Sequence, residues 1–492
     1  MTGDLNHKNM KNCVLILLSA LLTVPVFAAE PTAKTDAPAK EHLQNHFKLY
    51  GFIRNYFSFD SRESVSGTGD LFYYLPKDEK WNTADVNDPQ REDLNASPSF
   101  RFLALTSRLG VDVSGYYIGN VHFGAKIEGD FYSGLSSASK VNGLSGNTKV
   151  SGTATGRLRQ AYATITWKDL PLNKEEKASV GLKIGQAWHP MAADHPHLFS
   201  LEVGAPFGPF SRTPLVQMDA NLGKNWIVSA AAIWQMQYQS TGPSGSSAEY
   251  IKYGCTPEFY AAVGYKTKGF HVRAGADLVS IKPRNIGENA DGLTVHVKDR
   301  KTSLLYYAYA QYSHKAFAVK AKTTYGEGGE HMNLMSGYAK IGENPDGSWN
   351  YASMRNSSSW LSLSYGKKWQ GVLFLGYVKN LGLAEDAPQG PIVKDDVYFC
   401  GNGFSNINQM YRINPQIVYN IGKLNVGLEY QWTAVQYGAY KKVVRLDADA
   451  NPVLDKDGNQ IIDECLNERA LATDKLHWVG NHRINLMVKY NF

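Results

Sequence analysis

Apolar residues alternate with polar or small residues in segments of about 8–14 residues, from Phe47 to the end of the chain. In the last segment the even-numbered residues from Ile484 to Phe492 are apolar or aromatic, and the odd-numbered residues from Arg483 to Asn491 are mostly polar. A period of two places successive side chains on opposite faces of a β-strand. A wall with one face in lipid and the other in water requires this pattern.

Connections of 18–41 residues alternate with turns of 3–10 residues along the whole series of segments. A membrane barrel has short turns at one end and long loops at the other. We therefore predict an all-β protein, a transmembrane antiparallel β-barrel of about sixteen strands with long external loops and short periplasmic turns. The predicted strands cover approximately 47–60, 100–113, 121–132, 156–167, 178–188, 212–220, 226–238, 257–266, 270–282, 303–312, 316–325, 358–365, 371–381, 407–419, 424–437 and 479–492.

The first 28 residues have the layout of a secretory signal peptide. Lys8 and Lys11 give a positive start, 14–22 is an apolar core, and Ala28 is a small residue at the expected cleavage site. Residues 29–46 are rich in Ala, Pro and charge, and we predict a flexible periplasmic lead-in there. The barrel then occupies residues 47–492.

The composition excludes several classes of protein. A formal net charge of +6, from 51 basic and 45 acidic residues, is too small to indicate nucleic-acid binding. No internal apolar run reaches 18 residues, which argues against transmembrane helices. The 29 Tyr residues outnumber the 20 Phe, and Tyr suits a membrane interface, where its ring lies in apolar surroundings and its hydroxyl reaches water.

The phase of the strands places charged side chains inside the barrel. Arg157 and Arg159 lie close together on one face, but that face would also carry Ile165 and Trp167, so we expect a bulge or an early strand end there. A close basic pair in a narrow channel attracts small anions, whereas pairing with carboxylates would make it only a solvated wall. The predicted basic wall of the lumen consists of Arg54, Arg108, Lys126, Arg157, Arg159, Arg273, Lys320, Lys322, Arg483 and Lys489, with Lys183 and Lys266 on the same face. The acidic residues on that face are Asp60, Asp112, Glu128, Asp130, Asp219, Glu258, Asp277 and Glu429.

The third long loop, about 189–211, is rich in histidine. Its polar residues are His189, Asp194, His195, His197 and Glu202. Imidazoles and a carboxylate are suitable metal ligands, but their spacing matches no metal motif, and we favour a polar loop in the pore. Residues 455–464 resemble a calcium loop only in part, since Val453 and Gln460 stand where ligands belong. No serine nucleophile lies in a catalytic motif, so we expect no enzyme, no metal and no cofactor.

Three cysteines follow the predicted signal peptide, too few for a disulfide scaffold. Cys400 and Cys465 lie in the seventh and eighth long loops, which are neighbours in a barrel, and Cys255 lies in the fourth. We therefore predict a Cys400–Cys465 disulfide, with three free thiols as the alternative.

Several segments resemble the trimeric outer-membrane porins of Gram-negative bacteria, and among them the DcaP-like porins. The resemblance is carried, in order, by KLYGFIRNYFSFD (48–60), TSRLGVDVSG (106–115), GAKIEGDFYSG (124–134), RLRQAYATI (157–165), VGLKIGQAWHPM (180–191), GYVKNLG (376–382) and the terminal Phe492. It implies sixteen strands, a homotrimer and a third loop folded into the pore.

The pattern and the resemblance together predict a porin in the outer membrane of a Gram-negative bacterium. Such a barrel is a water-filled channel for passive diffusion of small hydrophilic solutes, and the basic wall favours anions. Its expected partners are outer-membrane lipid, the barrel assembly machinery, which Tyr490 and Phe492 would engage as an assembly signal, and two further copies of the chain. The alternative is a surface adhesin or a structural outer-membrane barrel, which would not conduct ions.

Overall fold

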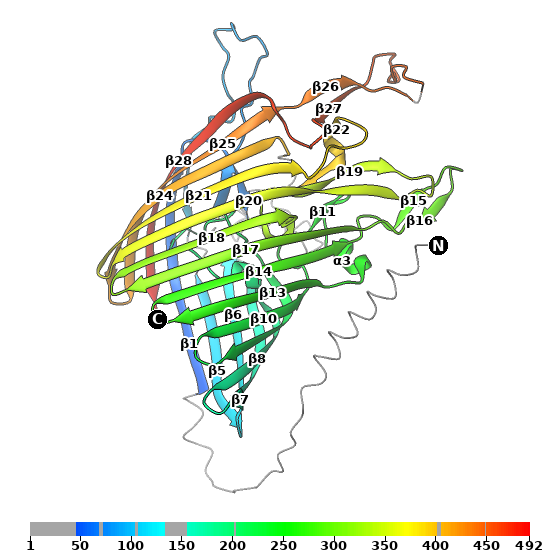
Figure 1. Cartoon of the computed structure of the whole chain (residues 1–492). Coiled ribbons are helices and arrows are strands. Elements are labelled where there is room, and N and C mark those ends of the chain that lie inside the picture. The colour runs from blue at the N-terminus through cyan, green and yellow to red at the C-terminus, as the bar shows by residue number, and fades with distance from the viewer. Residues whose placement is uncertain are drawn as a thin grey trace. The chain divides into compact units, whose positions relative to one another are not determined.

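The computed structural model describes residues 46–67, 72–103, 107–132, 155–200, 203–400, 405–447 and 449–492. The predicted signal peptide, almost all of the lead-in and Glu202 lie outside the described residues. Within the described residues, sixteen strands form the wall of one antiparallel β-barrel (Figure 1). We call each of these wall strands a stave, and β4 with β5 counts as one. In chain order they are β1 (Phe47–Asp60), β4 (Ser99–Leu103) with β5 (Arg108–Ile118), β6 (Val121–Tyr132), β7 (Thr155–Pro171), β8 (Lys177–Trp188), β9 (Arg212–Leu222), β10 (Trp226–Ile233), β13 (Glu258–Thr267), β14 (Phe270–Ile281), β17 (Lys301–His314), β18 (Phe317–Glu327), β20 (Trp349–Gly366), β21 (Trp369–Leu383), β24 (Ile407–Ile421), β25 (Leu424–Ala439) and β28 (Asp474–Asn491).

Pairing between the first and last staves closes the barrel. β1 runs antiparallel to β28, in a register that extends from Phe52 opposite Asn491 to Asp60 opposite Arg483. β4 and β5 both pair with β1 and together make one stave. All other staves pair with their neighbours in the chain, so the sheet has no free edge in its wall.

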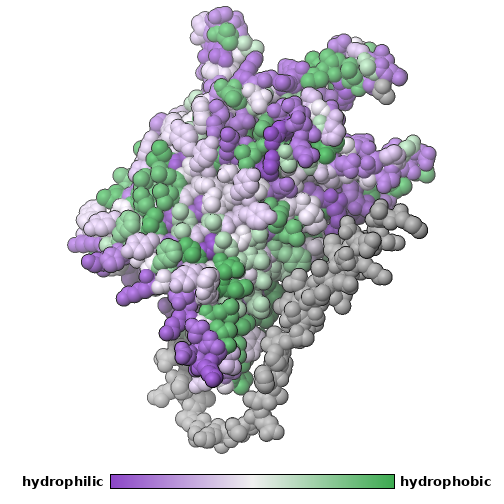
Figure 2. All heavy atoms as spheres, viewed as in Figure 1, coloured by the Kyte–Doolittle hydropathy of each residue, from purple (hydrophilic) through white to green (hydrophobic). Residues whose placement is uncertain are grey.

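The two faces of the wall differ in chemistry, as the alternation predicts. On β28, Ile484 and Leu486 are exposed on the outer face, whereas Arg483 and Asn485 are buried inside. Figure 2 shows green, hydrophobic residues gathered along the wall, whereas the projecting loops carry both hydrophilic and hydrophobic residues. In the described part of the chain, no helix is long and apolar enough to cross a membrane.

The long connections carry the remaining elements. Two of the loop strands join the main sheet, namely β19 (Gly337–Glu343) and β23 (Val397–Phe399). Small separate sheets consist of β2 (Ser64–Gly67), β3 (Phe72–Pro76), β11 (Thr241–Gly242), β12 (Gly245–Ser246), β15 (Ile286–Glu288), β16 (Thr294–His296), β22 (Ile392–Val393), β26 (Lys441–Val444) and β27 (Ile462–Leu466). The described helices are α3 (Glu249–Gly254) and the 3-10 turns η1 (Pro190–Ala192), η2 (Glu330–Met332) and η3 (Lys394–Asp396).

The third long loop leaves β8 and bonds to staves on the far side of the ring. The His197 amide donates to Ser362 Oγ of β20 at 3.0 Å, and the Phe199 amide donates to Gln416 Oε1 of β24 at 3.3 Å. The Tyr56 hydroxyl of β1 donates to the Phe199 carbonyl. In the strand order, β24 lies across the barrel from β8, so these described residues of the loop cross the interior.

The predicted fold class is confirmed, and each of the sixteen predicted segments coincides with a stave. Long and short connections alternate as expected. The expected irregularity in the fourth segment is also confirmed, because the register between β6 and β7 shifts between Glu128 and Gly129.

Candidate functional site

The register shift between β6 and β7 puts two arginines on the inner face. Asp130 lies opposite Arg157, and Glu128 lies opposite Gln160, so Arg159 is the extra residue of a bulge. Leu158, between the two arginines, is exposed on the outer face. The bulge therefore corrects the phase, and Arg157 and Arg159 point inward although Ile165 points outward.

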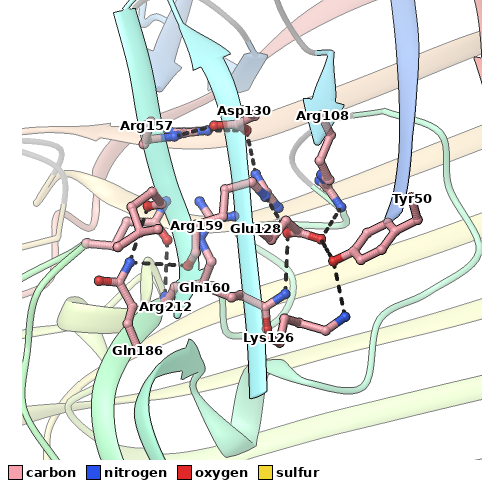
Figure 3. Close-up of polar contacts among 12 residues, drawn as sticks. Tyr50, Arg108, Lys126, Glu128, Asp130, Arg157, Arg159, Gln160, Gln186 and Arg212 are labelled. Carbon is pink, nitrogen blue, oxygen red and sulfur yellow. Dashed lines mark hydrogen bonds and ion pairs between the residues drawn. The ribbon is translucent and has the colours of Figure 1, made fainter. Parts of the chain in front are cut away.

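Both arginines bind the carboxylates of β6 (Figure 3). Arg157 makes a two-pronged contact with Asp130, from Nε at 2.9 Å and from Nη2 at 2.8 Å. Arg159 donates from Nε to Glu128 Oε1 at 2.9 Å and from Nη1 to Asp130 Oδ2 at 2.7 Å. Paired geometry of this kind fixes the planes of both guanidinium groups.

The contacts continue onto β5 and β1. Arg108 Nη1 lies 3.5 Å from Glu128 Oε2, and the Tyr50 hydroxyl donates to the same oxygen at 3.0 Å. Lys126 Nζ lies 2.9 Å from Asp112 Oδ1 and donates to the Tyr50 hydroxyl at 3.2 Å. Figure 3 shows Tyr50, Arg108, Lys126 and Glu128 converging from three neighbouring staves.

Three more cations border this network and stand over aromatic rings. Arg54 lies 4.8 Å from the centre of the Phe52 ring, and Lys489 lies 4.9 Å from the same centre. Arg212, the first residue of β9, lies 4.8 Å from the Trp188 ring centre and is buried. We call the whole set the basic cluster, and it comprises the cations Arg54, Arg108, Lys126, Arg157, Arg159, Arg212 and Lys489 and the carboxylates Asp112, Glu128 and Asp130. Seven cations against three carboxylates leave a formal excess of four positive charges.

The members of the basic cluster differ in exposure. Arg157, Arg108 and Lys126 keep 26%, 24% and 23% of their side-chain surface exposed, and Asp112 keeps 37%. Glu128 keeps 5%, Asp130 keeps 7% and Arg159 keeps 9%. Of these groups, three cations and one carboxylate are therefore open to solvent, and the other carboxylates are buried.

The other predicted wall cations do not belong to this cluster. Lys322 Nζ donates to the Met191 carbonyl at 2.6 Å, and Lys320 Nζ donates to the His195 carbonyl at 3.1 Å. Arg273 Nη1 lies 3.3 Å from Asp194 Oδ2. These three cations thus hold the third loop against β14 and β18.

Arg483 lies at the closing seam of the barrel, where its Nε donates to Asp60 Oδ1 at 2.8 Å. Of the predicted loop histidines, His197 Nδ1 contacts Ser364 Oγ at 2.8 Å, and the His195 ring packs edge-on against Trp188. His189 is fully buried and contacts Glu258 of the wall. The predicted loop residues therefore do not converge on one site.

The predicted Cys400–Cys465 disulfide is wrong, because all three described cysteines are free. The two residues lie in neighbouring loops but are held to different strands. The Cys400 amide donates to the Ser336 carbonyl, beside β19, whereas Cys465 pairs with Val393 and Lys441 in the β22–β27–β26 sheet. Burial raises the pKa of the Cys400 thiol to about 12, which keeps it protonated and unreactive.

We expect a thiol reagent to distinguish these cysteines. In the folded protein a maleimide should label Cys255, which is exposed, and should reach the buried Cys400 and Cys465 only after unfolding. The measurement is peptide mapping by mass spectrometry without reductant. A linked peptide that contains both Cys400 and Cys465 would contradict the structure.

The predicted assembly residues lie at the end of the last stave. Tyr490 and Phe492 are exposed on the outer face, and the Phe492 amide donates to the Gly51 carbonyl of β1 at 3.1 Å. The terminal residue therefore takes part in barrel closure and leaves its ring outside.

Sequence reasoning missed one member of the basic cluster, Arg212, and one residue that contacts the cluster, Tyr50. Arg212 opens β9, but the pattern could not assign it an inward phase at a strand end. Tyr50 is inward in phase, and its hydroxyl links Glu128 to Lys126. The sequence candidates for the lumen wall were all charged residues, so a neutral side chain such as Tyr50 was not among them.

No protein-family model matches the sequence, and no curated protein sequence matches it. Among solved structures, the chain is similar to the outer membrane channel DcaP of Acinetobacter baumannii, with a TM-score of 0.52 and 16% identity over 91% of this chain and 97% of that chain. It is also similar to the anion-selective porin from Comamonas acidovorans, with a TM-score of 0.46 and 9% identity over 91% and 99% of the two chains. A third similar structure is the trimer form of OmpT from Vibrio cholerae, with a TM-score of 0.44 and 11% identity over 91% and 99%. The similarity to DcaP confirms, at the level of the fold, the resemblance that the sequence motifs indicated.

Proposed function

We propose that the chain is an outer-membrane porin that lets small hydrophilic solutes diffuse passively and prefers anions. One observation carries the preference for anions: the basic cluster holds four more cations than carboxylates, and two of its three carboxylates, Glu128 and Asp130, are almost fully buried. A positive surface in a narrow channel raises the local concentration of anions and lowers that of cations. The fold shared with an outer membrane channel supports the proposal of a pore.

Conductance in planar lipid bilayers tests the proposal. We expect stepwise current increases on addition of the purified protein, and a reversal potential in a potassium chloride gradient that favours chloride. A barrel that serves only as an adhesin or a structural protein would insert without conducting. A reversal potential that favours potassium would be consistent with a porin but would contradict the proposed preference for anions.

The proposed setting is the bacterial outer membrane, where the exposed apolar wall contacts lipid and three copies associate. Cross-linking of the detergent-solubilised protein tests the trimer. Species of three chains are expected before heating, and single chains after it.

Loss of the last residue should impair assembly. Phe492 places its ring outside the wall and bonds its amide to β1, so a chain that ends at Asn491 lacks both a seam hydrogen bond and the proposed recognition residue. We expect a several-fold fall in heat-modifiable barrel in the outer membrane while export continues. Substitution of Phe492 by Tyr is the matched control, and unchanged barrel levels after deletion would contradict the assignment.

A further inference from the structure

Four buried side chains that could ligate a metal meet outside the basic cluster. They are His189, Glu258, Asp277 and His331, and their ligand atoms all lie within 4.8 Å of one another. His189 begins the third long loop, Glu258 begins β13, Asp277 lies in β14, and His331 lies in η2. No member exposes more than 2% of its surface.

A divalent cation fits the donor groups of this cluster. Two carboxylates and two imidazoles meet there without contact with solvent, and buried polar groups of this kind need charged or hydrogen-bonding partners. The nearby Glu330 already has its own partner, since Lys301 Nζ lies 3.5 Å from Glu330 Oε1. A divalent cation would neutralise Glu258 and Asp277.

His189 is better suited to orient a ligand than to be one. The Met191 amide donates to His189 Nδ1 at 3.1 Å, so this nitrogen carries no proton. A neutral ring then has its proton on Nε2, which contacts Glu258 Oε1. A hydrogen bond of this kind to a metal-binding carboxylate fixes its orientation.

The atoms that remain form the pocket for an ion. Glu258 Oε2, Asp277 Oδ1 and His331 Nε2 are buried and, among the described residues, make no hydrogen bond to a group outside this cluster. His331 Nε2 lies 3.2 Å from Glu258 Oε2 and 3.9 Å from Asp277 Oδ2. Ligands of a tetrahedral zinc ion lie about 3.3–3.5 Å apart when each is about 2.0–2.2 Å from the metal.

The donor set indicates the class of ion. Ca²⁺ and Mg²⁺ prefer oxygen ligands throughout. One imidazole with two carboxylates suits zinc, manganese, iron(II) or cobalt(II) better, because imidazole is a ligand for first-row transition ions.

We propose that Glu258, Asp277 and His331 bind a divalent transition-metal ion, and that His189 orients Glu258 through a hydrogen bond. The ion would join the loop that carries η2 to β13 and β14 of the wall. Through His189 it would also fasten the start of the third long loop. This site is separate from the basic cluster and does not depend on conduction.

Metal content of the untagged full-length protein, folded in detergent, tests the proposal. After treatment with EDTA and equilibration with Zn²⁺, mass spectrometry should find about one zinc per chain. Cobalt(II) should give visible absorption of the intensity typical of low-coordinate sites. Calcium at the same concentration should not displace the cobalt.

Variants separate ligands from supporting residues. His331→Gln and Glu258→Gln should each reduce zinc to background, whereas His189→Gln should weaken binding by about 10–100-fold and shift the cobalt spectrum. His197→Gln, a histidine of the same loop outside the cluster, is the matched control and should bind normally. Heat-modifiability verifies that each variant is folded.

If a variant does not fold, the cobalt spectrum of the wild-type protein still tests whether the metal site exists. Wild-type protein without zinc and without a cobalt spectrum, or undiminished zinc in folded His331→Gln, would overturn the site. Such an outcome would mean that the four side chains only share hydrogen bonds with one another and bind no metal.

Discussion

Substitution of both Arg157 and Arg159 by serine is expected to lower the preference for chloride over potassium roughly five-fold in dilute salt. Two unit charges about 8 Å from a passing ion change its energy by about 1 kcal/mol in water, and screening at about 0.1 M salt reduces this to about 0.5 kcal/mol. The change has opposite signs for chloride and potassium, so the ratio of the two ions changes by about 1 kcal/mol, or roughly five-fold. Their removal lowers the excess charge of the basic cluster from four to two, and it also removes both arginine partners of Asp130 and one of the partners of Glu128. The effect should shrink as salt rises, because the screening length falls to about 3 Å at 1 M.

The measurement is the reversal potential across a planar bilayer at several salt concentrations. Lys367 and Lys368 offer a matched control, since this adjacent basic pair is exposed on the short turn between β20 and β21. Serine at both control positions removes the same charge away from the cluster and should leave the potential nearly unchanged. Equal effects of the two double variants would show that net charge, not the position of the arginines, sets the selectivity.

Substitution of Asp60 by alanine should destabilise the barrel by about 3–5 kcal/mol, the cost of removing one partner from a buried ion pair. Asp60 Oδ1 accepts hydrogen bonds from Arg483 Nε at 2.8 Å and from Asn481 Nδ2 at 2.7 Å. Its Oδ2 lies 3.4 Å from Arg101 Nη2. Two cations would lose this carboxylate inside the seam that closes the barrel.

Urea unfolding in detergent or lipid vesicles measures the free energy of unfolding of the Asp60 variant. Asp463 is the matched control, because it also pairs with an arginine, Arg445, at 2.6 Å. That arginine is half exposed in the eighth loop, so Asp463→Ala should cost less than about 1 kcal/mol. Equal losses from the two substitutions would rule out burial as the source of the seam's stability.

The wall could be predicted from sequence because its signal is local. On β28, residues two apart share a face, and lipid on one side enforces apolar residues such as Ile484 and Leu486. The alternation of long and short connections then predicts that all the long loops lie at one end of the barrel. Even the bulge at Arg159 left a trace, since the inward phase of the two arginines conflicts with the outward phase of Ile165.

The partners of these residues could not be predicted, because they depend on register and on distant segments. The contact of Arg157 with Asp130 requires knowledge of which residues face each other across two strands. The metal-binding candidates come from positions 189, 258, 277 and 331, and no spacing in one segment relates them. The disulfide prediction used loop adjacency alone, whereas Cys400 follows β23 of the main sheet and Cys465 lies in the separate β22–β27–β26 sheet.

The anchoring of the third long loop has a mechanical consequence. A wall one strand thick flattens easily when it is compressed from the side, because no material opposes the change of cross-section. The loop is bonded to β18, β20 and β24 across the interior from β8, through contacts such as Lys322 with Met191 and Ser362 with His197. The loop therefore links staves on opposite sides of the ring, and we expect it to resist a change in the cross-section of the barrel.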